Sequence, residues 1–193
     1  MRAKIPFRVV ILFSLISRSW SAGIIHAQDR WTKANADIVR LSPRLFPKLP
    51  KGVVPKLLSM RCTIPQAKEI STRHNVIKGH FKRPKQTDWA VLCSRHRVSA
   101  VVIFWGGSAN SISQIARASD EGFLQTIDGD GTIGFSRRIA TVNRGYILEH
   151  YRNYHGPKPP PIDHQGIDDA FLEKASTIHY HFRRKWRELR GAD

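Results

Sequence analysis

Three consecutive apolar segments in the middle of the chain constrain its fold more than any other feature. They are rich in β-branched and aromatic residues and cover residues 75–81, 87–94 and 99–105. Short polar stretches, RPKQ and RHRV, separate them. Segments of this length and composition, joined by turns this short, are typical of neighbouring antiparallel strands. We therefore expect a three-stranded meander at the centre of the protein.

The remaining patterns predict hairpins and a few short helices. Helical spacing of apolar residues indicates helices near residues 53–58 and 143–154. The segment SISQIARA at 111–118 follows GGSAN, and we expect one short helix there. The DGDG sequence at 128–131 lies between two strand-like segments and predicts a hairpin. A second hairpin is expected around Arg183 and Arg184. Together these elements predict a single-domain α+β fold, with an antiparallel sheet built from a meander and hairpins.

The first 27 residues have the layout of a secretory signal peptide. Three basic residues precede an apolar run at 9–16, and small residues follow at Ala22 and Ala27. The run is too short to span a bilayer, although an uncleaved anchor helix is the alternative. We expect a secreted or periplasmic domain of residues 28–193. The sequence has no second long apolar segment, so we expect no transmembrane segment in that mature chain.

The only two cysteines are Cys62 and Cys93. In an exported protein an even pair is typical of a disulfide, and we expect these two residues to be joined. A zinc site is disfavoured because neither cysteine has a CxxC partner.

The net charge is strongly positive and unevenly distributed. The chain has 32 Lys and Arg against 15 Asp and Glu, a net charge of +17, and loss of the signal segment would leave +13. Residues 30–118 contain seventeen basic and only three acidic residues. Such an excess favours binding to anions, although an ordinary solvated surface is the alternative.

Six basic residues on and beside the turns of the expected meander are the candidate contacts. Because the two turns hold five of them, we expect these side chains to lie close together. They are Lys78, Lys82, Arg83, Lys85, Arg95 and Arg97. The partner would be an anionic polymer, a lipid surface or an acidic protein. No helix-turn-helix, zinc or RNP pattern indicates a specific nucleic-acid binder.

The segment KPPPIDHQGIDDAFLEK at 158–174 concentrates acids beside a histidine. Asp163 could cap a helix in which Ile167, Ala170 and Phe171 have helical spacing. The alternative is a metal or acid/base site, but His164 has no HxxxH or HxxE partner. The sequence favours the capped helix.

The sequence WGGSAN at 105–110 suggests an enzyme as an alternative. A strand followed by a glycine turn with Ser108 resembles a nucleophile elbow, and His164 and Asp163 would complete a triad. However, the elbow requires glycine where Asn110 stands.

The DGDG sequence resembles the start of a calcium loop, but it lacks the glycine and the glutamate that a calcium loop needs later in the motif. We expect neither a cofactor nor a metal.

Residues 79–105 resemble one FG-GAP-type repeat, in which Gly-x-Phe is followed by an acidic turn and an Asp-x-Ala-Val strand. The matching residues are Gly79, Phe81, Asp88, Ala90 and Val91. The family's calcium loop is missing, because KRPKQ is basic, and no second copy follows. The whole chain is similar to small secreted bacterial proteins of no known function. Neither resemblance implies catalytic residues.

We therefore expect a non-enzymatic binding module for an anionic envelope or extracellular partner. A small serine hydrolase built on Ser108 and an inhibitor of an envelope enzyme are the alternatives.

Overall fold

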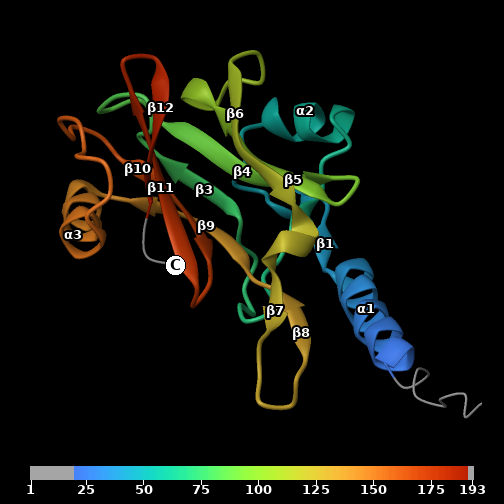
Figure 1. The fold of residues 1–193 in the computed structure, drawn as a ribbon. Helices are drawn as coiled ribbons and strands as arrows, with labels where there is room; N and C mark the ends of the chain where they lie inside the picture. The colour runs from blue at the N-terminus through green and yellow to red at the C-terminus, as the bar shows by residue number, and fades with distance from the viewer. Residues whose placement is uncertain (1–19, 191–193) are drawn as a thin grey trace, which may run out of the picture.

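The computed structural model describes residues 20–190, and their side chains from 28 to 189. Most of the expected signal segment, residues 1–19, lies outside the described residues. Residues 20–27 form the start of α1 (Trp20–Asp37), the longest helix described. Within residues 20–190, no helix combines the length and apolar character needed to cross a bilayer. The predicted α+β class is confirmed, because short helices accompany antiparallel sheets throughout (Figure 1).

The first sheet contains the predicted meander and one further strand. Its order is β3 (Val76–Gly79), β4 (Asp88–Arg95), β5 (Val98–Phe104) and β6 (Ile112–Ser119), all antiparallel. The helix predicted at 111–118 is therefore wrong. A bulge shifts the pairing of β5 with β6, and Ala116 has φ 52°. The pairing from Ile112 to Ile115 is regular, and the bulge lies beyond it, between Ile115 and Ala118. Ile112 and Ile115 therefore lie on opposite faces of β6, and their spacing in the sequence only resembles that of a helix face.

The second sheet is formed by the carboxy-terminal half of the chain. It contains β9 (Arg137–Val142), β10 (Gly166–Phe171), β11 (Ala175–Phe182) and β12 (Lys185–Arg190), in the order β12-β11-β10-β9. Helix α3 (Arg144–Tyr154) follows β9, and Asn143 caps it by accepting from the Tyr146 amide. The predicted helix at 143–154 and the hairpin between β11 and β12 are confirmed.

The helix predicted to begin at Asp163 is wrong, because this segment forms β10. Asp163 caps no helix, and its amide donates to the Tyr180 hydroxyl. β10 is a central strand, paired with β9 on one side and β11 on the other. Side chains alternate across a strand, so Asp168 and Asp169 point to opposite faces of the sheet. Both faces of the sheet are covered at β10, which explains why its residues are buried or half-buried along its whole length.

The two sheets pack face to face, and a helix covers the outer side of each (Figure 1). Residues of both sheets share the central core, including Leu92 and Ile103 from the first and Ile139 and Ile167 from the second. A second core lies between the first sheet and α2 (Val53–Ser59). A third lies between the second sheet and α3, where Ile147 is fully buried. The layers are thus helix, sheet, sheet and helix.

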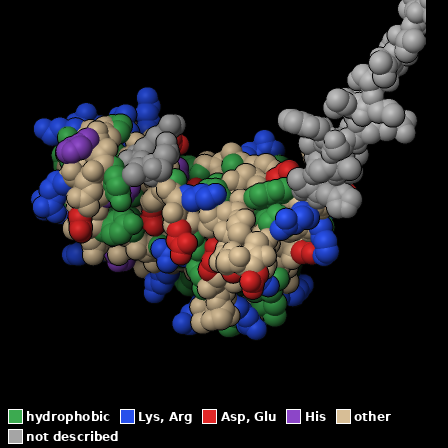
Figure 2. All heavy atoms as spheres, turned by 60° about the horizontal axis from the view of Figure 1, so that its bottom comes forward, with side chains coloured by type: hydrophobic (Ala, Val, Ile, Leu, Met, Phe, Trp, Pro, Cys, Tyr) green, Lys and Arg blue, Asp and Glu red, His purple; other side chains and the backbone are tan. Residues whose placement is uncertain are grey.

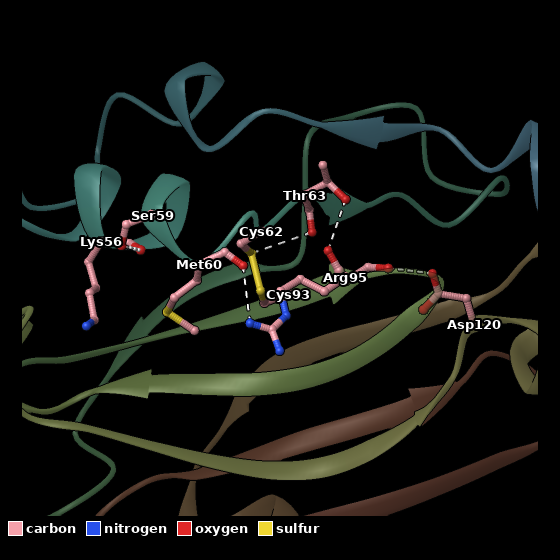
Figure 3. Close-up of a disulfide and its surroundings, with 9 residues drawn as sticks. Lys56, Ser59, Met60, Cys62, Thr63, Cys93, Arg95 and Asp120 are labelled. Atoms are coloured by element: carbon pink, nitrogen blue, oxygen red, sulfur yellow. Dashed lines mark hydrogen bonds between the residues drawn. A yellow bond between two sulfur atoms is a disulfide. The ribbon is translucent and has the colours of Figure 1, made fainter.

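The predicted disulfide joins Cys62, just after α2, to Cys93 on β4 (Figure 3). Both cysteines are buried and their Cα atoms are 5.3 Å apart. The next residues of the two segments, Thr63 and Ser94, are joined by two hydrogen bonds, in which the amide of each donates to the carbonyl of the other. The disulfide therefore fastens the α2 layer to the first sheet.

Small elements complete the fold. β1 (Arg40–Leu41) pairs with β2 (Ile64–Pro65), and β7 (Leu124–Thr126) pairs with β8 (Ile133–Phe135). The 3-10 helices are η1 (Pro43–Leu45), η2 (Trp105–Gly107) and η3 (Asp120–Phe123). The hairpin predicted at DGDG is confirmed.

The turn of the β7–β8 hairpin is organised by Asp128. Its side chain accepts hydrogen bonds from the Asp130 and Thr132 amides. The bonds from Thr132 are the main reason that the pKa of Asp128 is lowered. The acidic residue at this position therefore has a structural role in the turn.

Candidate anion-binding surface

The six predicted contact residues are all exposed, but they do not lie together. Lys82, Arg83 and Lys85 lie in the turn before β4, whereas Arg95 and Arg97 lie at its other end. Consecutive turns of a meander occur at opposite ends of the shared strand, and eight residues of strand span about 24 Å. The expectation that the two turns form one patch is therefore wrong. Figure 1 shows the β4–β5 turn well apart from the β3–β4 turn.

A different basic turn lies beside the β3–β4 turn. The Lys82 ammonium is 5.6 Å from the ring centre of Trp105, which follows β5. Trp105 stacks on Trp186 at the start of β12, with ring centres 5.6 Å apart and planes 20° from parallel. His181, at the end of β11, packs against both rings. The β11–β12 turn, residues 183–184, is thus brought to the same end of the molecule (Figure 1).

We call this end of the molecule the turn-end surface. It combines two basic turns with the aromatic cluster of Trp105, His181 and Trp186 between them. Its six exposed basic residues are Lys82, Arg83, Lys85, Arg183, Arg184 and Lys185. The three aromatic side chains are half-buried. Sequence analysis identified the first three cations, but it did not place the second three beside them.

Asp88 holds the β3–β4 turn and the η2 turn in place. This fully buried carboxylate accepts from the Phe81 and Lys82 amides through Oδ2, at 2.9 and 3.0 Å. Through Oδ1 it accepts from the Gly106 amide at 2.7 Å and from the Gln86 side chain. One buried acid therefore fixes both Lys82 and the segment that carries Trp105. Sequence analysis named Asp88 only in the resemblance to an FG-GAP-type repeat, where it begins the Asp-x-Ala-Val strand.

The aromatic cluster is electrically neutral at physiological pH. Burial lowers the pKa of His181, and the positive charge of the neighbouring Lys82 lowers it further. The Trp186 indole nitrogen donates to the Ser113 hydroxyl at 3.4 Å, which connects the second sheet to β6. The cluster therefore links the sheets without adding charge to the turn-end surface.

The far end of β4 carries separate basic residues. Arg95 donates to the Met60 carbonyl at 3.4 Å, next to the disulfide (Figure 3). Arg61 adjoins Met60, and Arg61 and Arg97 are both exposed. This group of three arginines offers a comparison for the turn-end surface, since it is also basic but, among the described residues, has no stacked tryptophan pair beside it.

A third face of the molecule mixes charges of both signs. Figure 2 shows the side that lies at the bottom of Figure 1. Lys and Arg side chains lie mostly around its margin, and Asp and Glu side chains lie among them nearer the middle. Where the described residues are visible on this face, the basic side chains are therefore interrupted by acidic ones.

The residues of the predicted hydrolase do not form a triad. Asp163 and His164 are hydrogen-bonded to each other, but the Ser108 hydroxyl accepts from the Asn110 amide, and no hydrogen bond among the described residues joins it to His164. His164 Nε2 is 2.9 Å from the His181 carbonyl oxygen, and its Nδ1 faces Asp163 and the Tyr180 hydroxyl. Both ring nitrogens are thus engaged within the protein. A general base needs a free nitrogen within reach of its nucleophile.

The hydrogen bond from His164 is the main cause of the lowered pKa of Asp163. Burial raises the pKa of Tyr180, whose hydroxyl lies between these residues. This group fastens the loop before β10 to β11. The hydrogen bonds among Asp163, His164 and Tyr180 are therefore explained by this structural role, and no catalytic role is needed to account for them.

A buried ion pair lies between the sheets and was missed by sequence analysis. Arg137 on β9 binds Asp169 on β10 through two hydrogen bonds, Nε–Oδ1 at 2.8 Å and Nη2–Oδ2 at 2.7 Å. The guanidinium also donates to Ser99 on β5 and to the Ala116 carbonyl on β6. Each of its three nitrogens therefore has a partner. His179 lies 3.8 Å from Asp169.

The two adjacent acids of β10 ionise differently. Burial alone would raise the pKa of Asp169, but the hydrogen bonds and charge of Arg137 outweigh burial and lower it. Burial raises the pKa of Asp168, which accepts from the Ser176 hydroxyl and lies 3.9 Å from Arg138. No three His, Cys, Asp or Glu side chains within the described part of the chain converge to hold a metal ion.

A comparison with protein-family models, curated proteins and solved structures found no match. The function has to be inferred from the residues described above.

Proposed function

We propose that the protein is a non-enzymatic binding module for an anionic polymer outside the cytoplasm, and that the turn-end surface is its contact site. The observation that carries the proposal is the convergence of two basic turns on the stacked pair Trp105 and Trp186. Two turns far apart in the sequence place six cations around one aromatic cluster. A chain with repeated negative charges could contact both turns at once.

The buried disulfide supports a role outside the cytoplasm, because disulfides persist mainly in oxidising compartments. The rigid aromatic cluster also supports binding rather than catalysis. The histidines beside it, His164 and His181, are committed to internal contacts.

A polymer fits this surface better than a lipid bilayer does. Proteins that insert into membranes present protruding apolar side chains. At the turn-end surface, Trp105 and Trp186 are half-buried, and Ile112, which pairs with Phe104, is one exposed large apolar residue beside them. A single isoleucine is too small to form an apolar wedge, and the six cations dominate this surface.

The test is the salt dependence of binding to heparin, a soluble sulfated polysaccharide, measured with the full chain. Each cation that contacts a polyanion contributes roughly 0.7–0.9 to the slope of log affinity against log salt. Four to six contacts predict a slope of about −3 to −5. Binding that does not change with salt would refute the proposal. Tighter binding to vesicles of anionic phospholipid than to heparin would favour a membrane surface instead.

A further inference from the structure

We infer that a cleft between α1 and the β7–β8 hairpin is a binding site for an anionic amphiphile, a molecule with one alkyl tail and a carboxylate or phosphate head. The cleft has a volume of about 560 Å³. Figure 1 shows α1 and the β7–β8 hairpin at the other side of the molecule from the β11–β12 turn, and the inference does not depend on the proposed function. We call it the helix cleft.

The interior of the helix cleft is largely apolar, although a few uncharged polar residues such as Gln66 and Thr132 also line it. Ile38, Ala67 and Phe135 are buried residues that line it, and Ile70 and Ile133 are half-buried ones. Its volume falls within the range of about 300–1,000 Å³ that is typical of sites for small molecules. An alkyl tail would replace water against these side chains.

Basic residues dominate the rim. Arg30 and Lys33 come from α1, and Lys68 and Arg73 come from the segment after β2. Among the described residues that line the helix cleft, Asp37 is the one acidic side chain, and it is paired with Lys33. An apolar interior with an excess of three positive charges at its rim is complementary to an apolar tail with a negative head.

Specific hydrogen bonds join the walls of the helix cleft to one another in a fixed arrangement. The Arg30 guanidinium donates to the Gly131 carbonyl at 2.8 Å, which joins α1 to the hairpin turn. The Lys68 amide donates to the Phe135 carbonyl at 2.8 Å, which joins the opposite wall to β8. A side chain at Gly134 would collide with Lys68, since its Cβ would lie 2.8 Å from the Lys68 Cβ.

The segment after β2 is held by His74. Its Nε2 accepts from the Ala67 amide at 2.7 Å, and its Nδ1 lies 2.8 Å from the Thr72 carbonyl oxygen. Gln66 makes further hydrogen bonds to both backbone groups of His74. The wall that carries Lys68 and Ile70 is thus formed before any ligand binds, which lowers the entropy cost of binding.

The experiment uses the full chain with labelled isoleucine methyl groups, titrated by NMR with decanoate, decyl phosphate and decyltrimethylammonium below their micelle concentrations. The methyl resonances of Ile38, Ile70 and Ile133 should shift with both anions. Those of Ile147 and Ile178, which lie in the α3 core, should not. Decanoate and decyl phosphate distinguish a carboxylate head from a phosphate head.

Two further measurements make the result specific. Lengthening the tail from decanoate to dodecanoate should tighten binding about fourfold per methylene, as expected for about 0.8 kcal/mol each. The variant Lys33→Gln/Lys68→Gln should weaken binding at least tenfold, whereas the charge-matched control Lys48→Gln/Lys51→Gln should leave it unchanged. All four lysines are exposed, so both variants should fold.

Equal binding of the ammonium amphiphile would overturn the inference. Shifts confined to isoleucines outside the helix cleft would overturn it too. So would the absence of any shift, which would mean that the helix cleft is closed or already filled by the protein's own chain.

Discussion

The ion pair between Arg137 and Asp169 gives the most demanding test of the fold. Replacing Asp169 by Asn keeps the shape of the side chain but removes its negative charge. Arg137 is only 1 % exposed, so the guanidinium would remain buried without a counter-charge. Breaking one partner of a buried pair typically costs about 3–5 kcal/mol. For a chain of this size that corresponds to a fall in Tm of about 6–20 °C.

The assay is urea unfolding of the wild type and Asp169→Asn at pH 7. The pH dependence has a defined sign, because the pKa of Asp169 is lowered in the folded state. The stabilisation from its ionised form is present above the unfolded pKa, near 3.9, and is lost as the pH falls through the folded pKa. The difference between the two proteins should therefore shrink in strong acid.

Asp168→Asn is the matched control, one residue away on the opposite face of β10. Burial raises the pKa of Asp168, so its charge costs stability above the folded pKa, and this cost disappears as the pH falls. An asparagine can still accept from Ser176. We expect the free energy of unfolding to stay within about 1 kcal/mol of wild type at pH 7. Equal losses from both variants, or a loss below about 1 kcal/mol for Asp169→Asn, would refute the reasoning.

Three further predictions concern other parts of the chain. Replacing both Cys62 and Cys93 by Ala should lower the free energy of unfolding by about 3–4 kcal/mol in urea, since the disulfide closes a loop across 31 positions; an unchanged midpoint would contradict this. Burial lowers the pKa of His74, so its NMR titration midpoint should lie below 6.5, and a midpoint above 6.5 would mean that its bond to the Ala67 amide is absent. If the amino-terminal segment is a signal peptide, amino-terminal sequencing of the protein recovered from the periplasmic or secreted fraction should begin near Gln28, and an intact Met1 there would refute cleavage.

Local patterns predicted the elements whose partners are close in the sequence. The meander and the β11–β12 hairpin connect strands across turns of a few residues, so composition and turn residues were sufficient. The pairing of Cys62 with Cys93 followed from there being only two cysteines.

β10 was missed because its fold depends on distant partners. Asp163, Asp168 and Asp169 fit the acidic start of a helix, and nothing local contradicts that interpretation. The decisive contacts are with β9 and β11 on both sides, and with Arg137, which lies 32 positions earlier. An ion pair of this kind leaves no periodic pattern in the sequence.

The candidate site was predicted in part. The sequence identified Lys82, Arg83 and Lys85 as exposed basic residues of a turn, which is a local property. It could not show that Trp105 and Trp186 stack, because that contact joins two different sheets. For the same reason, the sequence could not show that Arg183, Arg184 and Lys185 of the β11–β12 turn belong to the candidate site, or that Arg95 and Arg97 do not.

The most direct test of the proposed function compares charge reversal at the two ends of β4. One variant carries Arg83→Glu, Lys85→Glu and Arg184→Glu on the turn-end surface. The other carries Arg61→Glu, Arg95→Glu and Arg97→Glu at the far end. Both change the net charge by six, and all six side chains are exposed, so folding should be preserved.

The measurement is the affinity of each variant for heparin at 0.1 M salt. A Lys or Arg near an anionic surface contributes about 1 kcal/mol, so the turn-end variant should bind roughly 100-fold more weakly than wild type. The far-end variant should bind within about threefold of wild type, because most of its charges lie beyond the Debye length of about 10 Å. Equal loss from both variants would show that only the total charge matters, and would contradict a binding site at the turn-end surface.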